Sequence, residues 1–128
     1  MNIFEKEFDF VIQRAKSLDR PPRMVVAGAD CENILKAVFE AQNQGFCRPI
    51  LVGSEEKIST MLKKLGLYDR EYVISAVSDY EIDNDFHPYM KKALTIINDG
   101  LADVLVRGNT STRNFLMPIL DKKIGIAD

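Results

Sequence analysis

Cysteine and histidine are scarce in this sequence, and their scarcity limits the chemistry that the chain can carry. Of 128 residues, two are cysteine, Cys31 and Cys47, and one is histidine, His87. The cysteines form no CxxC pair, and a single histidine cannot complete a usual zinc site with them. We therefore expect no bound metal and two reduced thiols, as in the cytoplasm, where disulfides are rare.

Long apolar runs and an excess of one charge are also absent. No run approaches the ~20 residues that a membrane-spanning helix needs, and the N-terminal segment is acidic where a signal peptide would be basic. Lys and Arg number 17 against 19 Asp and Glu, which gives a formal net charge of -2. This balance does not support a general surface for nucleic acid or anionic membranes. The composition predicts a cytoplasmic globular protein that binds neither nucleic acid nor a membrane.

The length fits a single domain, residues 1–128, built from two alternating kinds of segment. Short β-branched runs that are apolar on both faces indicate buried parallel strands, and amphipathic stretches between them indicate helices. The expected strands cover residues 23–28, 49–53, 71–77 and 102–106. Because crossover helices imply parallel strands, the sequence predicts an α/β fold, a Rossmann-like three-layer sandwich: a parallel sheet of about four strands with helices on both faces.

Local patterns predict where several helices begin and end. Apolar residues recur every three or four positions over residues 3–18, which indicates an N-terminal helix. Two prolines in residues 19–22 would end this helix. Asp30 and Ser54 are the predicted N-caps of the helices that follow the first two strands. Pro118 is expected to kink the last helix or to force it to restart.

The carboxyl ends of the strands are the expected ligand edge, because open α/β sheets bind ligands there. Three strands end in glycine, at Gly28, Gly53 and Gly108, and glycine lets a ligand or another chain approach the backbone closely. The first lacks the further glycines of a dinucleotide fingerprint, and the sequence has no GxxxxGK[ST] phosphate loop. Gly28, Asp30 and Arg113 are candidates to line a cleft at this edge.

The segment richest in polar and cationic side chains is RGNTSTR, residues 107–113, which follows the fourth expected strand. It precedes a helix, whose N-terminal N–H groups and dipole favour an anion, and arginine can donate two parallel hydrogen bonds to phosphate. Two interpretations remain open: a phosphate-binding loop, or a helix cap at Ser111 or Thr112 with solvated arginines. No residue is assigned as catalytic, and the candidate phosphate- and substrate-binding residues are Arg107, Gly108, Asn109, Ser111 and Thr112.

Three segments carry a resemblance to a known family: VVAGADCENILKAV, QGFCRPILVGSEEKI and INDGLADVLVRGNTSTRNFLMPILDKKIGI. From about Arg23 to Ile126 the chain resembles the phosphate acetyl/butyryltransferases, and its GN-x-ST loop is closer to the butyryl branch. The resemblance implies half of a two-domain α/β fold, with the active site between the domains and the C-terminal domain absent. It also implies coenzyme A and phosphate as substrates, no tightly bound cofactor, and a homodimer.

The resemblance extends to single residues. Arg107 stands where many members of the family have lysine, which keeps the charge but changes the donor geometry. Pro118 replaces a residue that favours helix in many butyryl-type members. The positions that match the family's cleft loop are Gly108, Asn109, Ser111 and Thr112.

Three hypotheses about function follow. The first is an N-terminal domain or truncated form of an enzyme that transfers a short acyl group between coenzyme A and inorganic phosphate. In that case the missing second domain would supply most coenzyme A contacts and the catalytic residues. The second is a non-catalytic module that binds an anion or a nucleotide, or that serves in assembly. The third is a structural remnant that dimerises through an apolar face.

Overall fold

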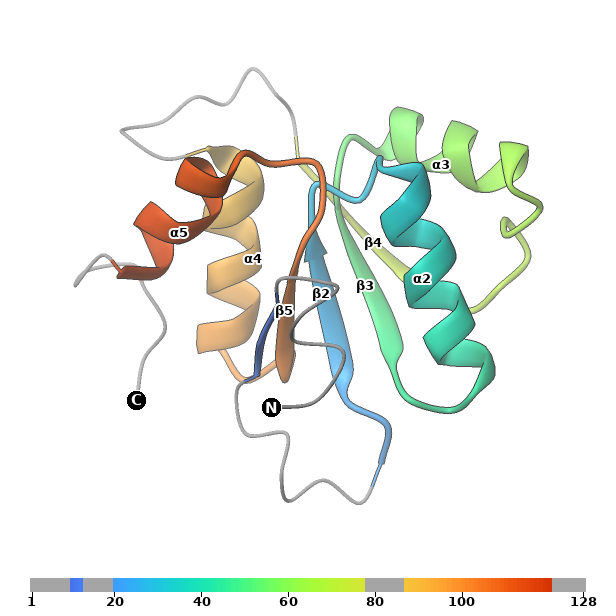
Figure 1. Ribbon diagram of the computed structural model, residues 1–128, viewed down its shortest axis with the longest axis horizontal. Coiled ribbons are helices and arrows are strands. Elements are labelled where there is room, and N and C mark those ends of the chain that lie inside the picture. The colour runs from blue at the N-terminus through green and yellow to red at the C-terminus, as the bar shows by residue number, and fades with distance from the viewer. Residues whose placement is uncertain (1–9, 13–19, 78–86, 121–128) are drawn as a thin grey trace.

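A mostly parallel sheet forms the centre of the computed structural model, which describes residues 10–12, 20–77 and 87–120 (Figure 1). Its strands follow the order β1-β5-β2-β3-β4. Four of them pair in parallel, as predicted. The strands are β1 (Phe10–Ile12), β2 (Arg23–Ala27), β3 (Arg48–Gly53), β4 (Val73–Ala76) and β5 (Val104–Arg107).

The prediction of a helix over residues 3–18 is wrong at its centre, where Phe10–Ile12 form strand β1. This strand runs antiparallel to β5, with Phe10 opposite Val106 and Ile12 opposite Val104. The remainder of the predicted helix lies outside the described residues. The run Phe-Val-Ile suits a strand as well as a helix, and pairing with the open edge of β5 decides between the two.

Helices cover both faces of the sheet, which confirms the three-layer arrangement (Figure 1). Val25 and Leu105 belong to a core that includes residues of α4 and α5. Val26 and Val104 belong to a second core that includes residues of α2 and α3. Successive strand residues therefore point to opposite buried faces. The helices are α2 (Glu32–Asn43), α3 (Glu55–Lys64), α4 (Pro88–Asn98) and α5 (Thr112–Leu120).

Helix starts agree with the sequence in one case and differ in another. Ser54 caps α3, with its hydroxyl accepting from Lys57 N at 3.3 Å. The predicted cap at Asp30 is wrong, because Cys31 occupies the N-cap of α2 and makes no side-chain capping bond. Helix α5 continues through Pro118 without a restart.

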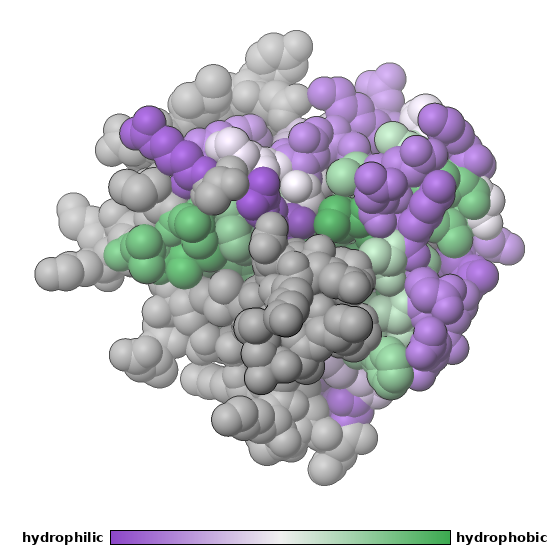
Figure 2. Space-filling model, in the orientation of Figure 1, coloured by the Kyte–Doolittle hydropathy of each residue, from purple (hydrophilic) through white to green (hydrophobic). Residues whose placement is uncertain are grey.

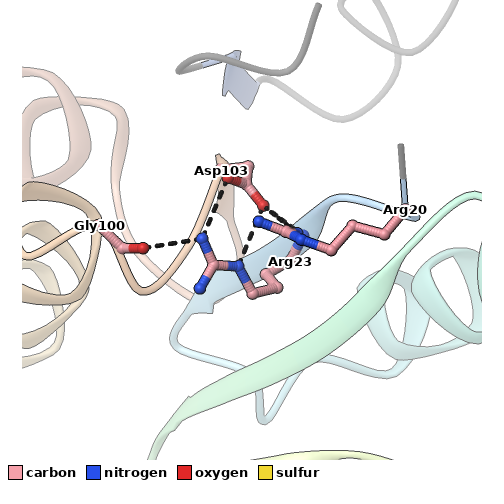
Figure 3. A network of polar contacts seen from close by, with 4 residues as sticks. All are labelled: Arg20, Arg23, Gly100 and Asp103. Atoms are coloured by element: carbon pink, nitrogen blue, oxygen red, sulfur yellow. Dashed lines mark hydrogen bonds and ion pairs between the residues drawn. The ribbon is translucent and has the colours of Figure 1, made fainter. Parts of the chain in front are cut away.

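An ion-pair network joins the amino ends of β2 and β5 (Figure 3). The Asp103 carboxylate, buried at 4% exposure, accepts from Arg23 N at 2.9 Å, Arg20 Nη1 at 3.1 Å and Arg23 Nε at 3.2 Å. Arg23 Nη2 also donates to Gly100 O at 2.7 Å. Because Asp103 N donates to Arg23 O at 2.8 Å, backbone and side chain together hold the two strands at this end.

The network makes the ionised carboxylate the preferred form in the folded protein. Burial by itself raises the pKa of Asp103, but hydrogen bonds from the Arg23 side chain and backbone and from Arg20 outweigh it. The pKa is therefore lowered from the ordinary 3.8. A group with a lowered folded pKa stabilises the protein above its unfolded pKa. This stabilisation is lost as the pH falls from about 4 through the folded value.

We predict that Asp103→Asn lowers the free energy of unfolding by about 2 kcal/mol at pH 7, because two guanidinium groups lose their anionic partner. The difference from the native protein should shrink as the pH falls from 5 to 2, because the native carboxylate becomes protonated over that range. Urea unfolding followed by circular dichroism measures both effects. Asp99→Asn, at an exposed position, is the control. An equal penalty at pH 7 and pH 2 would contradict the electrostatic explanation.

Candidate functional site

The carboxyl ends of the parallel strands meet at one rim of the sheet, at the top of Figure 1. The register pairs Ala27 with Arg107 and Gly53 with Ala76. Helices α2, α3 and α5 begin at this rim, each after a short turn that follows a strand. The predicted loop at residues 107–113 therefore lies at the same edge as the other strand ends, where α/β sheets bind ligands.

Two turns at this rim contact each other backbone to backbone. Gly108 N donates to Ala27 O at 3.0 Å, and Asn109 N donates to Gly28 O at 2.6 Å. Gly28 has a φ of 80°, and a Cβ there would lie 2.9 Å from Asn109 O. A Cβ on Gly108 would overlap Gly28 O. These glycines admit the neighbouring turn of the same chain, which is one of the two uses that the sequence suggested.

Most backbone amides of these two turns already donate hydrogen bonds within the protein. Gly28 N and Ala29 N both donate to Val52 O, at 2.9 and 3.0 Å. Thr110 N donates to Gly108 O at 2.9 Å. An anion at this rim must therefore be bound by other groups, namely the first turn of α5 and nearby side chains.

Ser111 caps α5 and leaves part of the helix start available. Its hydroxyl accepts from Asn114 N at 3.0 Å, and its carbonyl accepts from Phe115 N at 3.0 Å. The backbone N–H groups of Thr112 and Arg113 lie in the first turn of α5. No carbonyl of the helix is placed to accept from them, so they point away from the helix end. A cap at Ser111 is therefore compatible with an anion at the start of α5. The hydroxyl satisfies only one backbone donor, and the helix dipole still favours negative charge there.

The Arg107 side chain lies across the loop and is not a solvated surface arginine. It is half-buried, and its Nε donates to Thr110 O at 3.2 Å. Arg113, by contrast, is exposed. Thr110 Oγ1 is buried and has no hydrogen-bond partner in the described part of the chain. Thr110 was not among the predicted binding residues, although the run of three hydroxyl residues was a signal for it.

Asp30 points to the loop and not to the helix that it was predicted to cap. Both of its carboxylate oxygens lie 3.4 Å from Asn109 Nδ2. The contact follows from the paired turns, because Asn109 is bonded through its backbone to Gly28, two residues before Asp30. A carboxylate therefore lies beside Asn109, one of the predicted binding residues.

A hollow at the opposite rim contains none of the predicted site residues. It measures about 580 Å³, and Arg23, Arg48 and Tyr72 are among its lining residues. Its Arg23 is already paired with Asp103. The C-terminal end of α2 contributes Asn43 to the lining, and helix C-termini disfavour anions. The hollow is therefore a poorer place for phosphate than the carboxyl rim.

The described residues carry no group of three or more His, Cys, Asp or Glu side chains that could hold a metal ion. Cys31 and Cys47 are both free. Burial raises the pKa of the Cys47 thiol to about 11, and its Sγ donates to Val38 O at 3.4 Å. At neutral pH it is therefore a packed thiol and not a nucleophile. Among the helices described, none is long and apolar enough to cross a bilayer.

The fold and the rim define an open α/β domain in which a polar loop joins β5 to helix α5. Comparison with known proteins makes the class more specific. The chain is 32% identical over 125 residues to the phosphate butyryltransferase of Clostridium acetobutylicum and 32% identical over 123 residues to that of Clostridium beijerinckii. It is 25% identical over 104 residues to the phosphate acetyltransferase of Thermotoga maritima. No protein-family model matches it.

The predicted resemblance to the phosphate acetyl/butyryltransferase family is therefore confirmed. It covers 94% of this chain, and the chain spans about 38% of the length of the two butyryltransferases. A phosphotransacetylase from Streptococcus pyogenes has the same fold, with a TM-score of 0.65 at 22% identity. That match covers 84% of this chain and 39% of the other, which agrees with half of a two-domain fold.

We predict that Gly28→Ala lowers the free energy of unfolding by about 2–4 kcal/mol, because strain at a positive φ is joined by collision with the Asn109 backbone. Gly45 provides a matched control: its φ is 77°, and an added Cβ meets nothing within 4 Å. Gly45→Ala should cost only about 1 kcal/mol. Denaturant unfolding compares the two variants. Equal losses would mean that the contact between the turns adds nothing to stability.

Proposed function

We propose that this chain is the phosphate-binding part of a phosphate acyltransferase of the butyryl type. Such an enzyme converts acyl-CoA and inorganic phosphate into acyl phosphate and coenzyme A, and the reverse. The observation that carries the proposal is the placement of the Arg107 side chain over the loop that starts α5. The similarity to two phosphate butyryltransferases supports it. Residues 1–128 would form one domain of the enzyme.

The loop's groups suit the charge changes of this reaction. When the thiolate of coenzyme A attacks the carbonyl of an acyl phosphate, a carbon–sulfur bond forms and the carbon–oxygen bond breaks. The phosphate leaves with the electron pair of that bond. The Arg107 guanidinium and the N–H groups at the start of α5 would stabilise the negative charge on the departing phosphate. The Thr110 hydroxyl is buried without a partner in the described part of the chain, so a shift of the loop on binding would have to expose it before it could donate to the phosphate and satisfy its unmet hydrogen bond.

A second function, a non-catalytic module that binds an anion or nucleotide, is favoured by a different observation. Within the described residues, the rim has hydrogen-bond donors for an anion. In that part of the chain it has no acid and base residues that are joined by a hydrogen bond, as a catalytic pair would be. Such a module would bind phosphate through Arg107 and the start of α5 without turning over an acyl group.

An acyl-transfer assay separates these two functions. Purified chain is mixed with butyryl phosphate and coenzyme A, and formation of the thioester is followed by its absorbance. Turnover supports the acyltransferase. Without turnover, phosphate binding that butyryl phosphate displaces is the result expected of the phosphate-binding part alone, whereas phosphate binding that butyryl phosphate leaves unchanged supports the module. If the chain shows neither turnover nor phosphate binding, the proposed site is refuted.

We also propose that the protein acts in the cytoplasm as a homodimer with small-molecule substrates. Figure 2 shows apolar residues gathered over α5, where Leu116 and Leu120 are 44% and 74% exposed. Their spacing of four residues places them on one face of the helix. An exposed apolar face of this kind is typical of a surface that another chain or domain covers.

We predict that Arg107→Ala weakens phosphate binding by about tenfold or more, because a charge-assisted hydrogen bond is lost. Arg107→Lys should weaken it less, since the charge remains without the planar fork. Isothermal titration calorimetry measures the affinities, and thermal unfolding confirms that each variant is folded. Lys92→Ala, at an exposed position on α4, should bind like the native protein. Unchanged affinity in Arg107→Ala would leave the loop as a helix cap only.

We further predict that Thr110→Val moves stability and binding in opposite directions. Removing a buried hydroxyl without a partner should leave the free energy of unfolding equal or raise it by up to about 1 kcal/mol. Phosphate affinity should fall severalfold, because one donor to the anion is gone. Thr110→Ser keeps the hydroxyl and should retain the affinity. If Thr110→Val binds phosphate as well as the native protein, the hydroxyl takes no part in binding.

A further inference from the structure

The carboxylate of Asp30 lies beside Asn109, a residue of the loop that forms the proposed phosphate site, which is unexpected for a site that attracts anions. It faces the amide of Asn109, and both of its oxygens are 3.4 Å from Asn109 Nδ2. Within the described residues, no ion pair joins Asp30 to a cation. Its charge is therefore not neutralised by a neighbouring basic side chain in that part of the chain.

The position of Asp30 is fixed by the backbone. Gly28 and Asn109 are joined by a 2.6 Å hydrogen bond, and the close approach leaves no space for a Cβ on Gly28. Asp30 follows two residues later, just before the N-cap of α2. Its side chain does not cap that helix, so its oxygens remain available as acceptors beside the loop. Asn109 Nδ2 carries two N–H groups, so one can bind Asp30 while the other is directed elsewhere.

A carboxylate beside an anion site distinguishes oxyanions by their protons. A fully deprotonated oxyanion is repelled by the carboxylate and offers it no hydrogen bond. An oxyanion that keeps a proton can donate a short, charge-assisted hydrogen bond to the same carboxylate. Inorganic phosphate keeps at least one proton at pH 7, whereas sulfate keeps none, although the two ions are close in size and shape.

We propose that Asp30 is a specificity-determining residue that makes the rim accept protonated tetrahedral oxyanions, inorganic phosphate in particular, and reject sulfate. The inference rests on the proposed phosphate site at Arg107 and the start of α5. Asp30 accepts the proton-bearing oxygen of phosphate, while Arg107 and the helix start bind the remaining, negatively charged oxygens. Asn109 is a positioning residue, because its amide holds the carboxylate against the loop.

The test compares phosphate and sulfate affinities by calorimetry in a chloride buffer at pH 7. The native protein should bind phosphate at least about tenfold more tightly than sulfate, the ratio that one charge-assisted hydrogen bond provides. Asp30→Asn should bind sulfate severalfold more tightly and phosphate more weakly, so that the ratio approaches one. Asp30→Glu keeps the carboxylate and should still reject sulfate. Asp99→Asn removes an exposed carboxylate elsewhere and should leave the ratio unchanged.

The outcomes separate this inference from the proposed function. If the native protein binds phosphate and Arg107→Ala weakens that binding as predicted, the site stands regardless of Asp30. An unchanged phosphate-to-sulfate ratio in a folded Asp30→Asn would then overturn the role of Asp30 alone. If the native protein binds neither ion, the proposed function and this inference both fail.

Discussion

The backbone contact between the turns after β2 and β5 organises the rim that carries the candidate site. Gly28 and Gly108 have no side chain, and only because of this can the turn after β5 come close enough to donate two backbone hydrogen bonds to the turn after β2. The contact places Asn109 beside Asp30 and directs the chain into α5. The site's polar groups are therefore positioned by main-chain geometry, which is more rigid than a set of exposed side chains would be.

The same two strands are fastened at their other ends by Asp103. Its carboxylate binds Arg23 at the start of β2, and its own amide bonds to the Arg23 carbonyl. The β2–β5 pair is thus fixed by ions at one rim and by glycine turns at the other. Binding of the proposed anion at the loop would therefore require little reordering of these strands.

Local sequence patterns predicted much of this fold. The predictions that were wrong concern contacts between residues far apart in the sequence. Ser54 was found as a helix cap because the cap depends on residues three apart in sequence. Asp30 has the same local signature, but the Asn109 amide competes for its carboxylate from 79 residues away. The pairing of Phe10–Ile12 with β5 likewise depends on an edge that no local pattern reveals. The loop at residues 107–113 was identified by composition, whereas the buried Thr110 hydroxyl required coordinates.

The order of the strands has a consequence for synthesis on the ribosome. The last strand of the described residues, β5, is not at the edge of the sheet but between β1 and β2. The part made from β2, β3 and β4 can pair as it emerges, but β1 has no partner until β5 has been translated. Until then the flank of β2 is an open edge, a surface that can pair with other nascent chains. The position between β1 and β2 is filled only when β5, in the C-terminal quarter of these residues, leaves the exit tunnel.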